Sequence, residues 1–406
     1  MSSDWVSKPL SEVIDIISGG TPKTSDPSFW NGGIPWLSIV DFNNGNRYVN
    51  KTDKHITEAG LSKSATTMLQ VRDIIISARG TVGVLAQVGK PMAFNQSCYG
   101  IRGKDKLADT DFIYYVLKYS VQKLKTVSHG AVFDTITKQT FDLIDVMLPS
   151  YQEQERIAGV LGCLDDRIAL LRETNATLET ITQTLFKSWF VDFDPVHAKQ
   201  QGREPEGMDA DTAEFFPDSF EESELGLVPR GWLPKRIDTL MKLSYGKALK
   251  ADDRIAGEVP VYGSGGITGY HNESLVNDPS IIVGRKGTVG SLYWEDQPFF
   301  PIDTVFYIHS FVPMTYCFYL LQTLGLRDMN TDAAVPGLNR NNVYRLMVPC
   351  AAQAVVSAFD GITRLIRDAI FRNSQQAQTL ATLRDTLLPR LISGQLRLPE
   401  AVDTNA

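Results

Sequence analysis

The strongest constraint on the fold is a pattern of mostly apolar residues that occurs twice with identical spacing. The first copy begins at Ile157 and the second at Val355, and in both copies the steps alternate between four and three residues. This alternation is the heptad period of a coiled coil, so it predicts one long helix for each copy. The seam residues are Ile157, Leu161, Leu164, Ile168, Leu171, Asn175, Leu178, Thr182, Leu185 and Trp189 in the first copy, and Val355, Phe359, Ile362, Ile366, Ala369, Asn373, Gln376, Leu380, Leu383 and Leu387 in the second.

An asparagine falls at the same step in both copies, at Asn175 and at Asn373. A seam asparagine costs stability but fixes register and choice of partner. We therefore expect the two helices to pair with each other in an antiparallel coiled coil. The alternative is two unrelated amphipathic helices, each covering its own domain. The expected pairing residues are Leu164, Ile168, Asn175, Ile366, Asn373 and Leu380.

An antiparallel pair would give the chain a pseudo-two-fold axis, with one folded domain at each end of the helices. At about 1.5 Å per residue, such helices form a rod of about 50 Å. This length corresponds to about 15 base pairs of duplex DNA at ~3.4 Å each. The helices could therefore serve as a ruler between two DNA contacts.

A short β-branched run followed by a basic, glycine-rich turn also occurs twice, in residues 73–83 and 280–290. Each half opens on a tryptophan, Trp5 or Trp232. We therefore predict an α+β fold with two β-rich mixed domains separated by two long helices and related by an internal repeat. The expected segments are a first domain over 1–150, a helix over 151–190, an acidic linker over 191–231, a second domain over 232–350, a helix over 351–394 and a tail over 395–406.

The net charge of −7 is unevenly distributed. Residues 151–231 hold 17 acidic and 7 basic side chains, whereas residues 1–150 hold 14 acidic and 16 basic ones. Local clustering of positive charge decides whether a surface can meet phosphate. The acidity of the linker therefore does not exclude nucleic-acid binding by the two domains, and it predicts that the linker faces away from DNA.

The four cysteines lie far apart in the sequence and form no metal-ligand pattern. We expect neither a metal site nor a disulfide framework, and we place the protein in the reducing cytoplasm. No apolar run approaches the ~20 residues of a membrane span, so no membrane partner is expected. The start of the sequence, Met1-Ser2-Ser3-Asp4-Trp5, does not resemble a signal peptide.

Catalytic signatures are missing from the sequence. There is no phosphate-binding loop, no dinucleotide fingerprint, no HExxH or GxSxG motif, and no Asn-Pro-Pro-aromatic motif of adenine methyltransferases. The five histidines are scattered, and Asp192 and Asp194 lie in the expected linker. We therefore predict no catalytic, cofactor-binding or metal-binding residue in this chain.

Several glycine-rich loops have the composition of a nucleic-acid contact. They combine small hydroxyls, basic side chains and exposed main-chain amides, which suit phosphates and guanine edges. The expected DNA-binding residues are Gly20, Thr21, Lys23, Arg79, Gly80, Thr81, Lys125, Lys138, Lys247, Tyr262, Ser264, Arg285, Lys286 and Thr288. A glycine–lysine turn alone is weak evidence, but here the same strand and basic turn appear in both halves.

Several longer segments carry a recognisable family pattern. They include Leu148-Pro149 followed by Glu153-Gln154-Glu155-Arg156-Ile157, and Leu164-Asp165-Asp166-Arg167-Ile168. Further marks are Leu185-Phe186-Lys187-Ser188-Trp189-Phe190-Val191-Asp192-Phe193-Asp194-Pro195, the restart at Ser223-Glu224-Leu225-Gly226-Leu227-Val228-Pro229-Arg230-Gly231-Trp232, and the ending Leu387-Leu388-Pro389-Arg390-Leu391-Ile392-Ser393-Gly394. With these segments, nearly the whole chain resembles the specificity subunits of type I restriction–modification systems.

The resemblance implies two target-recognition domains, each reading one half of a split DNA sequence. It implies that the helices dock two modification subunits, which bring S-adenosylmethionine and methylate adenine. A motor-nuclease restriction subunit, with its ATP and magnesium, would join for restriction. The second copy departs from the pattern after Pro349, because it reads Cys350-Ala351-Ala352-Gln353 without the Glu-Gln pair of Glu153-Gln154.

Two other function classes compete with this interpretation. A scaffold that joins two domains by a coiled coil and binds only proteins fits the acidic isoelectric point of about 5.4. The duplicated basic turns argue against it. A DNA-cleaving enzyme would need a cluster of metal-binding carboxylates, which the sequence lacks.

Overall fold

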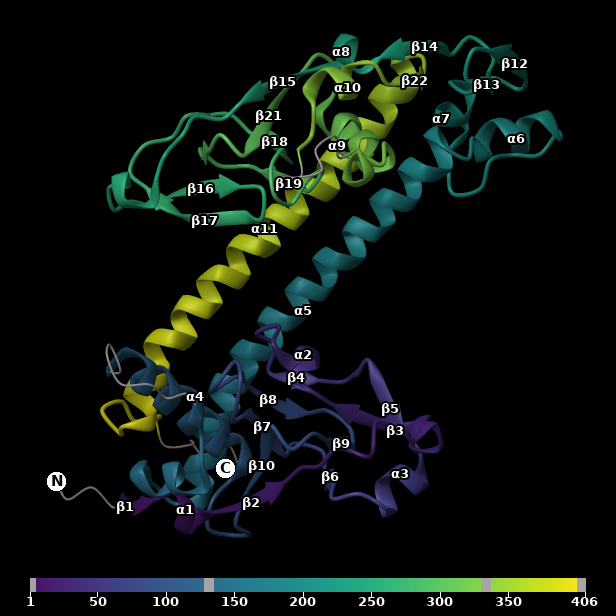
Figure 1. The fold of residues 1–406 in the computed structure, drawn as a ribbon. Helices are drawn as coiled ribbons and strands as arrows, with labels where there is room; N and C mark the ends of the chain where they lie inside the picture. Colours follow the sequence, from purple (N-terminus) through teal and green to yellow (C-terminus); the bar gives the residue numbers. More distant parts are fainter. Residues whose placement is uncertain (1–4, 128–134, 330–336, 400–406) are drawn as a thin grey trace, which may run out of the picture. The chain divides into compact units, whose positions relative to one another are not determined.

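A computed structural model describes residues 5–127, 135–329 and 337–399. The chain forms two compact units (Figure 1). Unit 1 comprises Met1–Glu173 and Ser374–Ala406, and unit 2 comprises Thr174–Asn373. Both boundaries fall inside long helices, so each helix contributes one part to each unit.

The main sheet of unit 1 has the strand order β2-β10-β7-β8-β4. Its inner strand β7 is an isoleucine run that is buried on both faces, as expected of β-branched residues in a covered sheet. Helix α4 covers the sheet with consecutive buried residues from Phe112 to Leu117. The bounds are β2 Ile14–Ser18, β4 Tyr48–Val49, β7 Ile74–Ser77, β8 Leu85–Val88, β10 Cys98–Gly103 and α4 Thr110–Val127.

Smaller elements complete unit 1. A second sheet has the order β5-β3-β9-β6, and an antiparallel ribbon joins β1 to β11 directly before the first long helix. Their bounds are β1 Val6–Pro9, β3 Trp30–Leu37, β5 Lys54–Ile56, β6 Met68–Leu69, β9 Met92–Phe94 and β11 Asp145–Leu148, with short helices α1 Leu10–Val13, α2 Ile39–Phe42 and α3 Glu58–Ser62.

Unit 2 repeats the first four strands of the main sheet and the ribbon of unit 1. Its main sheet has the order β15-β21-β18-β19, and its ribbon joins β14 to β22 before the second long helix. The parallel pair β16–β20 matches the parallel pair β3–β9 of unit 1. The bounds are β14 Leu233–Arg236, β15 Met241–Tyr245, β16 Val259–Gly263, β17 Gly266–His271, β18 Ser280–Gly284, β19 Leu292–Glu295, β20 Phe300–Pro301, β21 Val305–Ser310 and β22 Met347–Cys350, with helices α8 Ile237–Leu240, α9 Met314–Thr323 and α10 Arg340–Tyr344.

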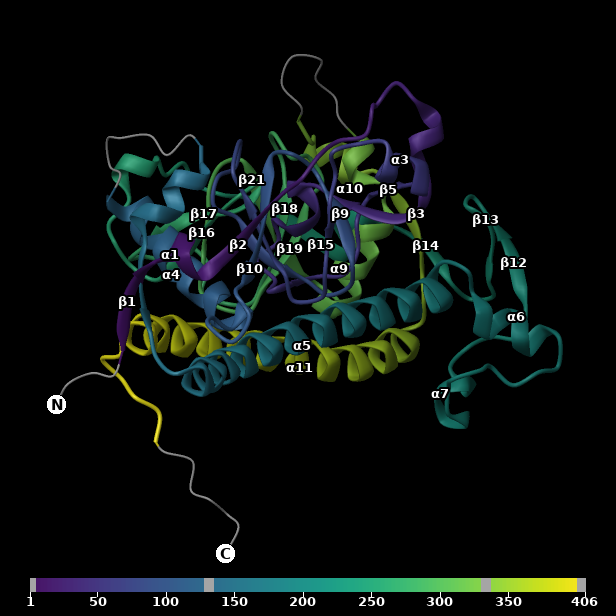
Figure 2. The same ribbon diagram turned by 90° about the horizontal axis from the view of Figure 1, so that it is seen from below.

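The two long helices are α5 (Tyr151–Phe190) and α11 (Gln353–Ile392), and they pack against each other in both units (Figure 2). In unit 1, Ile168 and Leu171 form an apolar cluster with Ala377. In unit 2, the rings of Phe186 and Phe359 lie 5.5 Å apart. Residues later in α5 meet residues earlier in α11, so the pairing is antiparallel. The predicted α+β fold with paired long helices is confirmed.

The apolar seam of α11 differs from the predicted one at alternate steps. Ile362 and Leu383 are 41% and 45% exposed, whereas Thr363 and Ala377 are buried. Phe359, Ile366, Asn373 and Leu380 keep their seam places. An α-helix drifts by ~20° per heptad against a strict 3.5-residue repeat, so the buried side moves to the neighbouring residue. Thr363 satisfies its buried hydroxyl by donating to the main-chain oxygen of Phe359 at 2.8 Å.

The segment expected to be a linker, 191–231, is folded. It contains helices α6 (Asp194–Gln200) and α7 (Ala210–Glu214) and the hairpin β12 (Phe220–Ser223)–β13 (Gly226–Pro229) beside the end of α5 (Figure 2). The reason is aromatic packing. Phe216 is buried edge-on against Trp189, and Phe193 lies edge-on against Trp232 at 5.5 Å.

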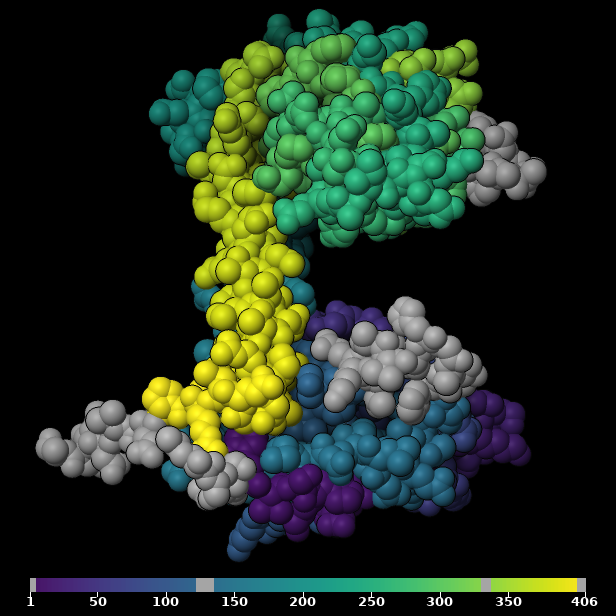
Figure 3. Space-filling model, turned by 90° about the vertical axis from the view of Figure 1, so that its left-hand side faces the viewer, coloured from purple at the N-terminus to yellow at the C-terminus, as the bar shows by residue number. Residues whose placement is uncertain are grey.

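The core of unit 2 includes the first turns of α11. Val355, Val356 and Phe359 are buried with strand residues such as Leu243 and Val283. Figure 3 shows this contact on the surface, where the β-rich part of unit 2 covers one side of α11. Among the helices that the structure describes, none combines the length and apolar character needed to span a membrane.

Candidate nucleic-acid interface

The basic turn of unit 2 connects β18 to β19 and has a constrained backbone. Gly287 and Gly290 adopt φ values of 82° and 69°, which side chains with a Cβ rarely adopt. The amide of Gly290 donates to the carbonyl of Gly284 at 2.9 Å. A Cβ on Gly290 would also meet the main chain of Leu326 at 2.5 Å. The turn is therefore fixed, and it holds Lys286 exposed at the surface.

Two predicted DNA-binding residues meet at this turn. The hydroxyl of Ser264 accepts a hydrogen bond from the amide of Thr288 at 3.3 Å. The main-chain oxygen of Ser264 accepts from Ser291 Oγ at 2.6 Å. Ser264 comes from the loop between β16 and β17, so the structure brings together two segments that the sequence only suggested separately.

Unit 1 builds the same turn between β7 and β8. Gly80 and Gly83 adopt φ values of 76° and 78°, and the amide of Gly83 donates to the carbonyl of Ser77 at 2.9 Å. Arg79 forms an isolated bridge with Thr135, as Lys286 does with Gly337 in unit 2. Arg79, Gly80 and Thr81 are exposed.

The repeat matches Arg79 with Lys286, not with Arg285. The carbonyl of Ala78 accepts from Ile136, and the carbonyl of Arg285 accepts from Leu338 in the same way. Arg285 therefore stands where unit 1 has the buried residue Ala78.

The turn of unit 1 lies beside a polar pair. Thr21 Oγ1 donates to Gln96 Oε1, and Gln96 stands next to Ser97, whose carbonyl accepts from the amide of Ala78 at 2.8 Å. Gly20 is buried, and a Cβ there would meet the main chain of Ala65 at 2.4 Å, so this glycine serves close packing. Gln96 was missed by the sequence analysis, since it lies in a short loop without a basic or glycine-rich pattern.

The structure describes the side chains of three of the four remaining predicted lysines. Lys23, Lys138 and Lys247 are exposed. Lys138 begins a short helical turn directly after Thr137, as Arg340 follows Asn339 in unit 2. The side chain of Lys125 lies outside the part of the chain whose side chains are described.

Tyr262 must be removed from the candidate set. Its side chain is 6% exposed, within an apolar cluster that includes Phe299. Its hydroxyl donates to Glu295 Oε2 at 2.8 Å, and burial raises the pKa of this hydroxyl well above its ordinary value. A nucleobase has no access to this ring, because the ring belongs to the core.

Arg285 was a predicted DNA-binding residue, but the sequence analysis missed the aromatic and basic side chains around it in unit 2. The guanidinium carbons of Arg285 and Arg340 each lie 4.9 Å from the ring centroid of Tyr245. Tyr245 is 48% exposed at the end of β15. The only sequence signal was its place at the end of a strand, directly before Gly246-Lys247.

Neither metal ligands nor reactive thiols gather in the described residues. No group of three or more His, Cys, Asp or Glu residues there could hold a metal ion. Burial raises the pKa of Cys98 and of Cys317 to about 12, so both thiols stay protonated at neutral pH.

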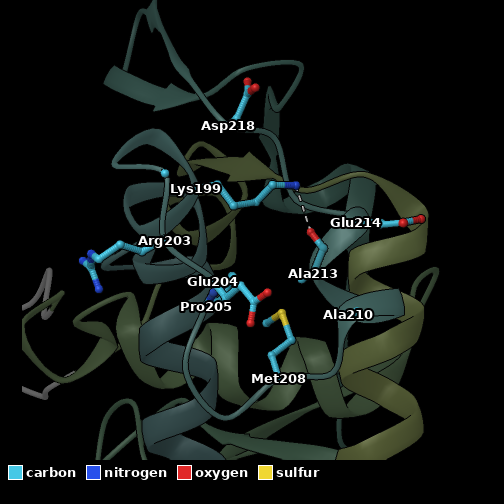
Figure 4. A pocket seen from close by; sticks show the side chains of 10 residues that line it. Lys199, Arg203, Glu204, Pro205, Met208, Ala210, Ala213, Glu214 and Asp218 are labelled. Carbon is cyan, nitrogen blue, oxygen red and sulfur yellow. Dashed lines mark hydrogen bonds between the residues drawn. The ribbon is translucent and has the colours of Figure 1, made fainter.

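A hollow in the folded acidic segment has a volume of about 470 Å³ (Figure 4). Lys199 crosses it, and its Nζ donates to the carbonyl of Ala213 at 3.0 Å and to that of Phe216. Glu204, Met208 and Glu214 also line it. Because the lysine is bound to main-chain oxygens, the hollow offers a ligand mainly acidic and apolar side chains, and we assign it no site.

Comparison with known proteins agrees with these features. The family model of the type I restriction modification DNA specificity domain matches residues 2–180 and 229–341. The type I restriction enzyme MjaIX specificity subunit of Methanocaldococcus jannaschii is 25% identical over 428 aligned positions, covering 98% of this chain and 94% of that protein. The HindI specificity subunit of Haemophilus influenzae is 27% identical over 68% of this chain and 74% of its own length.

Among solved structures, the type I restriction–modification S subunit of M. genitalium shares the fold. It superposes with a TM-score of 0.57 at 18% identity, over 96% of both chains. The chain belongs to the type I restriction modification DNA specificity family, whose members recognise DNA sequence within restriction–modification complexes. Specificity subunits are non-catalytic components of these systems, as the missing catalytic motifs predicted.

Proposed function

We propose that each unit reads one half of a bipartite double-stranded DNA target through the surface around its basic turn. The observation that carries this proposal is the repeated turn itself. Positive-φ glycines hold Arg79 in unit 1 and Lys286 in unit 2 at matching exposed positions. A basic side chain on a rigid turn suits a phosphate contact, and such a contact would hold the neighbouring side chains at the base edges.

The proposal assigns partner docking to the long helices. Leu170, Ile181 and Leu365 are 51%, 50% and 70% exposed, so these apolar side chains are available for contact with a partner. Two modification subunits would cover these surfaces and bring S-adenosylmethionine, and a motor-nuclease subunit would bring ATP and magnesium. This chain would bind none of these cofactors itself and would act with its partners in the cytoplasm.

The spacer between the two half-targets would follow the length of the paired helices. Coiled helices are stiff, so the separation of two DNA contacts joined by them depends on helix length. The antiparallel contacts within each unit support this role.

The direct test is reconstitution. The purified chain with DNA and S-adenosylmethionine should leave adenines unmodified, whereas addition of the modification subunit should give methylation at a split motif with a fixed gap. Methyl transfer by the chain alone, or modification without a split motif, would contradict the proposal.

The alternative is a scaffold that binds only proteins, which the acidic segment 191–231 favours. The two functions differ in one measurement. A scaffold would give the assembled complex no more affinity for DNA than the modification subunit has alone.

A further inference from the structure

The guanidinium of Arg285 is held in a fixed position at the surface of unit 2. Its Nη1 donates to the main-chain oxygen of Asp303 at 2.8 Å. Its carbon lies 4.9 Å from the ring centroid of Tyr245 and 5.9 Å from that of Phe306. A guanidinium fixed by a hydrogen bond and by ring contacts loses little further freedom when it binds a ligand.

The other edge of this guanidinium remains available. Among the described residues, neither Nε nor Nη2 of Arg285 has a hydrogen-bond partner, and the side chain is half-buried rather than covered. Nε and Nη2 present two N–H donors in one plane. Two coplanar acceptors at matching spacing are offered by O6 and N7 of guanine in the major groove.

A second cation reinforces the site. Arg340 lies 4.9 Å from the same Tyr245 ring, and its Nη1 donates to the carbonyl of Leu243 at 3.4 Å. Lys286 stands next to Arg285 and is exposed. These charges favour an electronegative partner, such as the phosphates and guanine edges of a duplex.

Around Arg285, some positions hold a basic residue in both units, whereas others hold different residue types in the two units. In unit 2, Tyr245 pairs with Phe306 across two neighbouring strands, and in unit 1 Ser18 pairs with Tyr99 in the same way. Ser18 is therefore the unit 1 equivalent of Tyr245. The arginine and its aromatic platform are therefore both replaced in unit 1, by Ala78 and Ser18. The basic residues around them are kept, because Lys286 matches Arg79 and Arg340 matches Lys138.

We propose that Arg285 is a specificity-determining residue that reads one guanine in the half-target of unit 2, and that Tyr245 positions it. Unit 1 has Ala78 and Ser18 at these two places, so the two half-targets are read by different chemistry. The inference rests on the proposed DNA reading by unit 2. A phosphate contact by Arg285 is the competing interpretation, and the experiment below separates the two.

The experiment uses the complex of this chain with its modification subunits. The DNA is a set of unmethylated duplexes that contain the split motif that this complex methylates. Each guanine is replaced in turn by 7-deazaguanine, which keeps base pairing but lacks N7. Binding is measured for the wild type, for Arg285→Ala and Arg285→Lys, and for the control Arg236→Ala. Arg236 is an exposed arginine on β14 that pairs with Asp238.

The wild type and the control should lose about tenfold in affinity at one guanine, in one half-target only. Arg285→Ala should lose nothing further at that guanine, because alanine has no donor for O6 or N7. Arg285→Lys should keep part of the sensitivity, because one ammonium can still donate to these acceptors but lacks the planar fork of the guanidinium. Tyr245→Leu should reduce the discrimination without removing the charge. The proposal is overturned if Arg285→Ala keeps the wild-type sensitivity at every guanine and only its overall affinity falls, because that is the result expected of a phosphate contact. Loss of any split-motif preference in the wild type would instead contradict the proposed function.

Discussion

Nδ2 of Asn373 donates a hydrogen bond to Oδ1 of Asn175 at 2.9 Å, and Nδ2 of Asn175 donates to the carbonyl of Ile370 at 3.1 Å. Both side chains are half-buried between α5 and α11. Each asparagine thus finds its partner on the opposite helix. A slip of either helix would leave amide groups buried without partners, so this pair selects one register.

Asn373→Leu removes only one of the two paired amides, so it should destabilise the paired helices even though leucine is otherwise the more stabilising seam residue. Oδ1 of Asn175 would lose the hydrogen bond from Nδ2 of Asn373, and the loss of such a bond inside the seam costs about 1–3 kcal/mol. The expected result is a lower urea midpoint for the purified chain with an unchanged slope. Gln376→Leu is the matched control, because Gln376 is exposed on the same helix. Equal midpoints for the two variants would show that the asparagine pair contributes no stability to the paired helices.

A buried ionic cluster joins the two helices in unit 1. Asp165 on α5 accepts from Arg384 Nη1 on α11 at 2.5 Å and from the hydroxyl of Tyr115 at 2.8 Å. Lys118 Nζ lies 3.5 Å from Oδ2, the oxygen that the tyrosine also contacts. Burial by itself would raise the pKa of this carboxyl, but Lys118 and Arg384 outweigh it and hold the pKa below the ordinary value of 3.8.

This cluster predicts an acid-sensitive part of the stability. A carboxyl whose pKa is lower in the folded state stabilises the fold above its unfolded pKa, here 3.8. This stabilisation is lost as the pH falls from that value through the folded pKa. Asp165→Asn should abolish this part of the pH dependence in urea unfolding between pH 2 and 6. It should also cost about 1–3 kcal/mol at pH 7, because Lys118 and Arg384 lose a charged partner in a partly buried place.

Asp166→Asn provides the control, since Asp166 is the next residue and is exposed. It should keep the wild-type pH profile. Identical profiles for the two variants would mean that Asp165 does not carry the acid-labile stability.

The sequence predicted those parts of the fold that repeat locally. The seam period placed both long helices, and the paired Asn175 and Asn373 predicted their association. The strand and basic turn predicted the duplicated sheets. All of these signals are periodicities or short motifs that a single stretch of chain contains.

The remainder depends on contacts between distant segments. Tyr262 looks like an exposed loop aromatic in sequence, but its partner Glu295 lies on another strand. The Arg285–Tyr245–Arg340 cluster contains residues from three separate segments of the chain. The folded state of 191–231 depends on the packing of Phe216 on Trp189. Composition marks these positions only as polar, aromatic or acidic.

The matching residues Arg79 and Lys286 should act as sequence-independent contacts. Replacing either by Ala should weaken binding of the assembled complex about equally for all DNA sequences. The dependence of log affinity on log salt should become shallower by ~0.9 for each phosphate that the variant no longer neutralises. A salt titration of binding for Arg79→Ala, Lys286→Ala and the control Arg236→Ala measures this directly. A changed methylation motif in either variant would instead make that residue a base reader.

Gln96 should contribute to reading by unit 1. Its amide is held by Thr21 and lies beside the turn of Arg79. Glutamine can bind adenine N6 and N7 in the major groove, so Gln96→Ala should relax the preference at one position of one half-target by about 1–3 kcal/mol. The readout is the methylated motif of cells that express the variant complex. An unchanged motif with a lower thermal midpoint would assign Gln96 to loop packing alone.

The proposed ruler can be tested by lengthening both helices together. One heptad is inserted after Leu171 in α5 and another before Ala377 in α11. These two residues contact the same apolar cluster, so the two insertions lie opposite each other along the paired helices. A heptad preserves the phase of the seam. The control carries the heptad in α5 alone, which breaks the match, and this variant should fail to assemble with its partners.

The matched insertion adds about 10 Å of helix, from ~1.5 Å per residue, which equals about 3 base pairs at ~3.4 Å each. The spacer in the methylated motif should therefore grow by about two to four base pairs, since DNA twisting can absorb part of the change. Neither half-sequence should change, because the basic turns and their neighbours are untouched. Methylome sequencing gives the spacer directly, after unfolding and partner binding show that the variant is intact. If modification persists at the original spacing, the partner subunits set the distance between the half-targets and the helices do not.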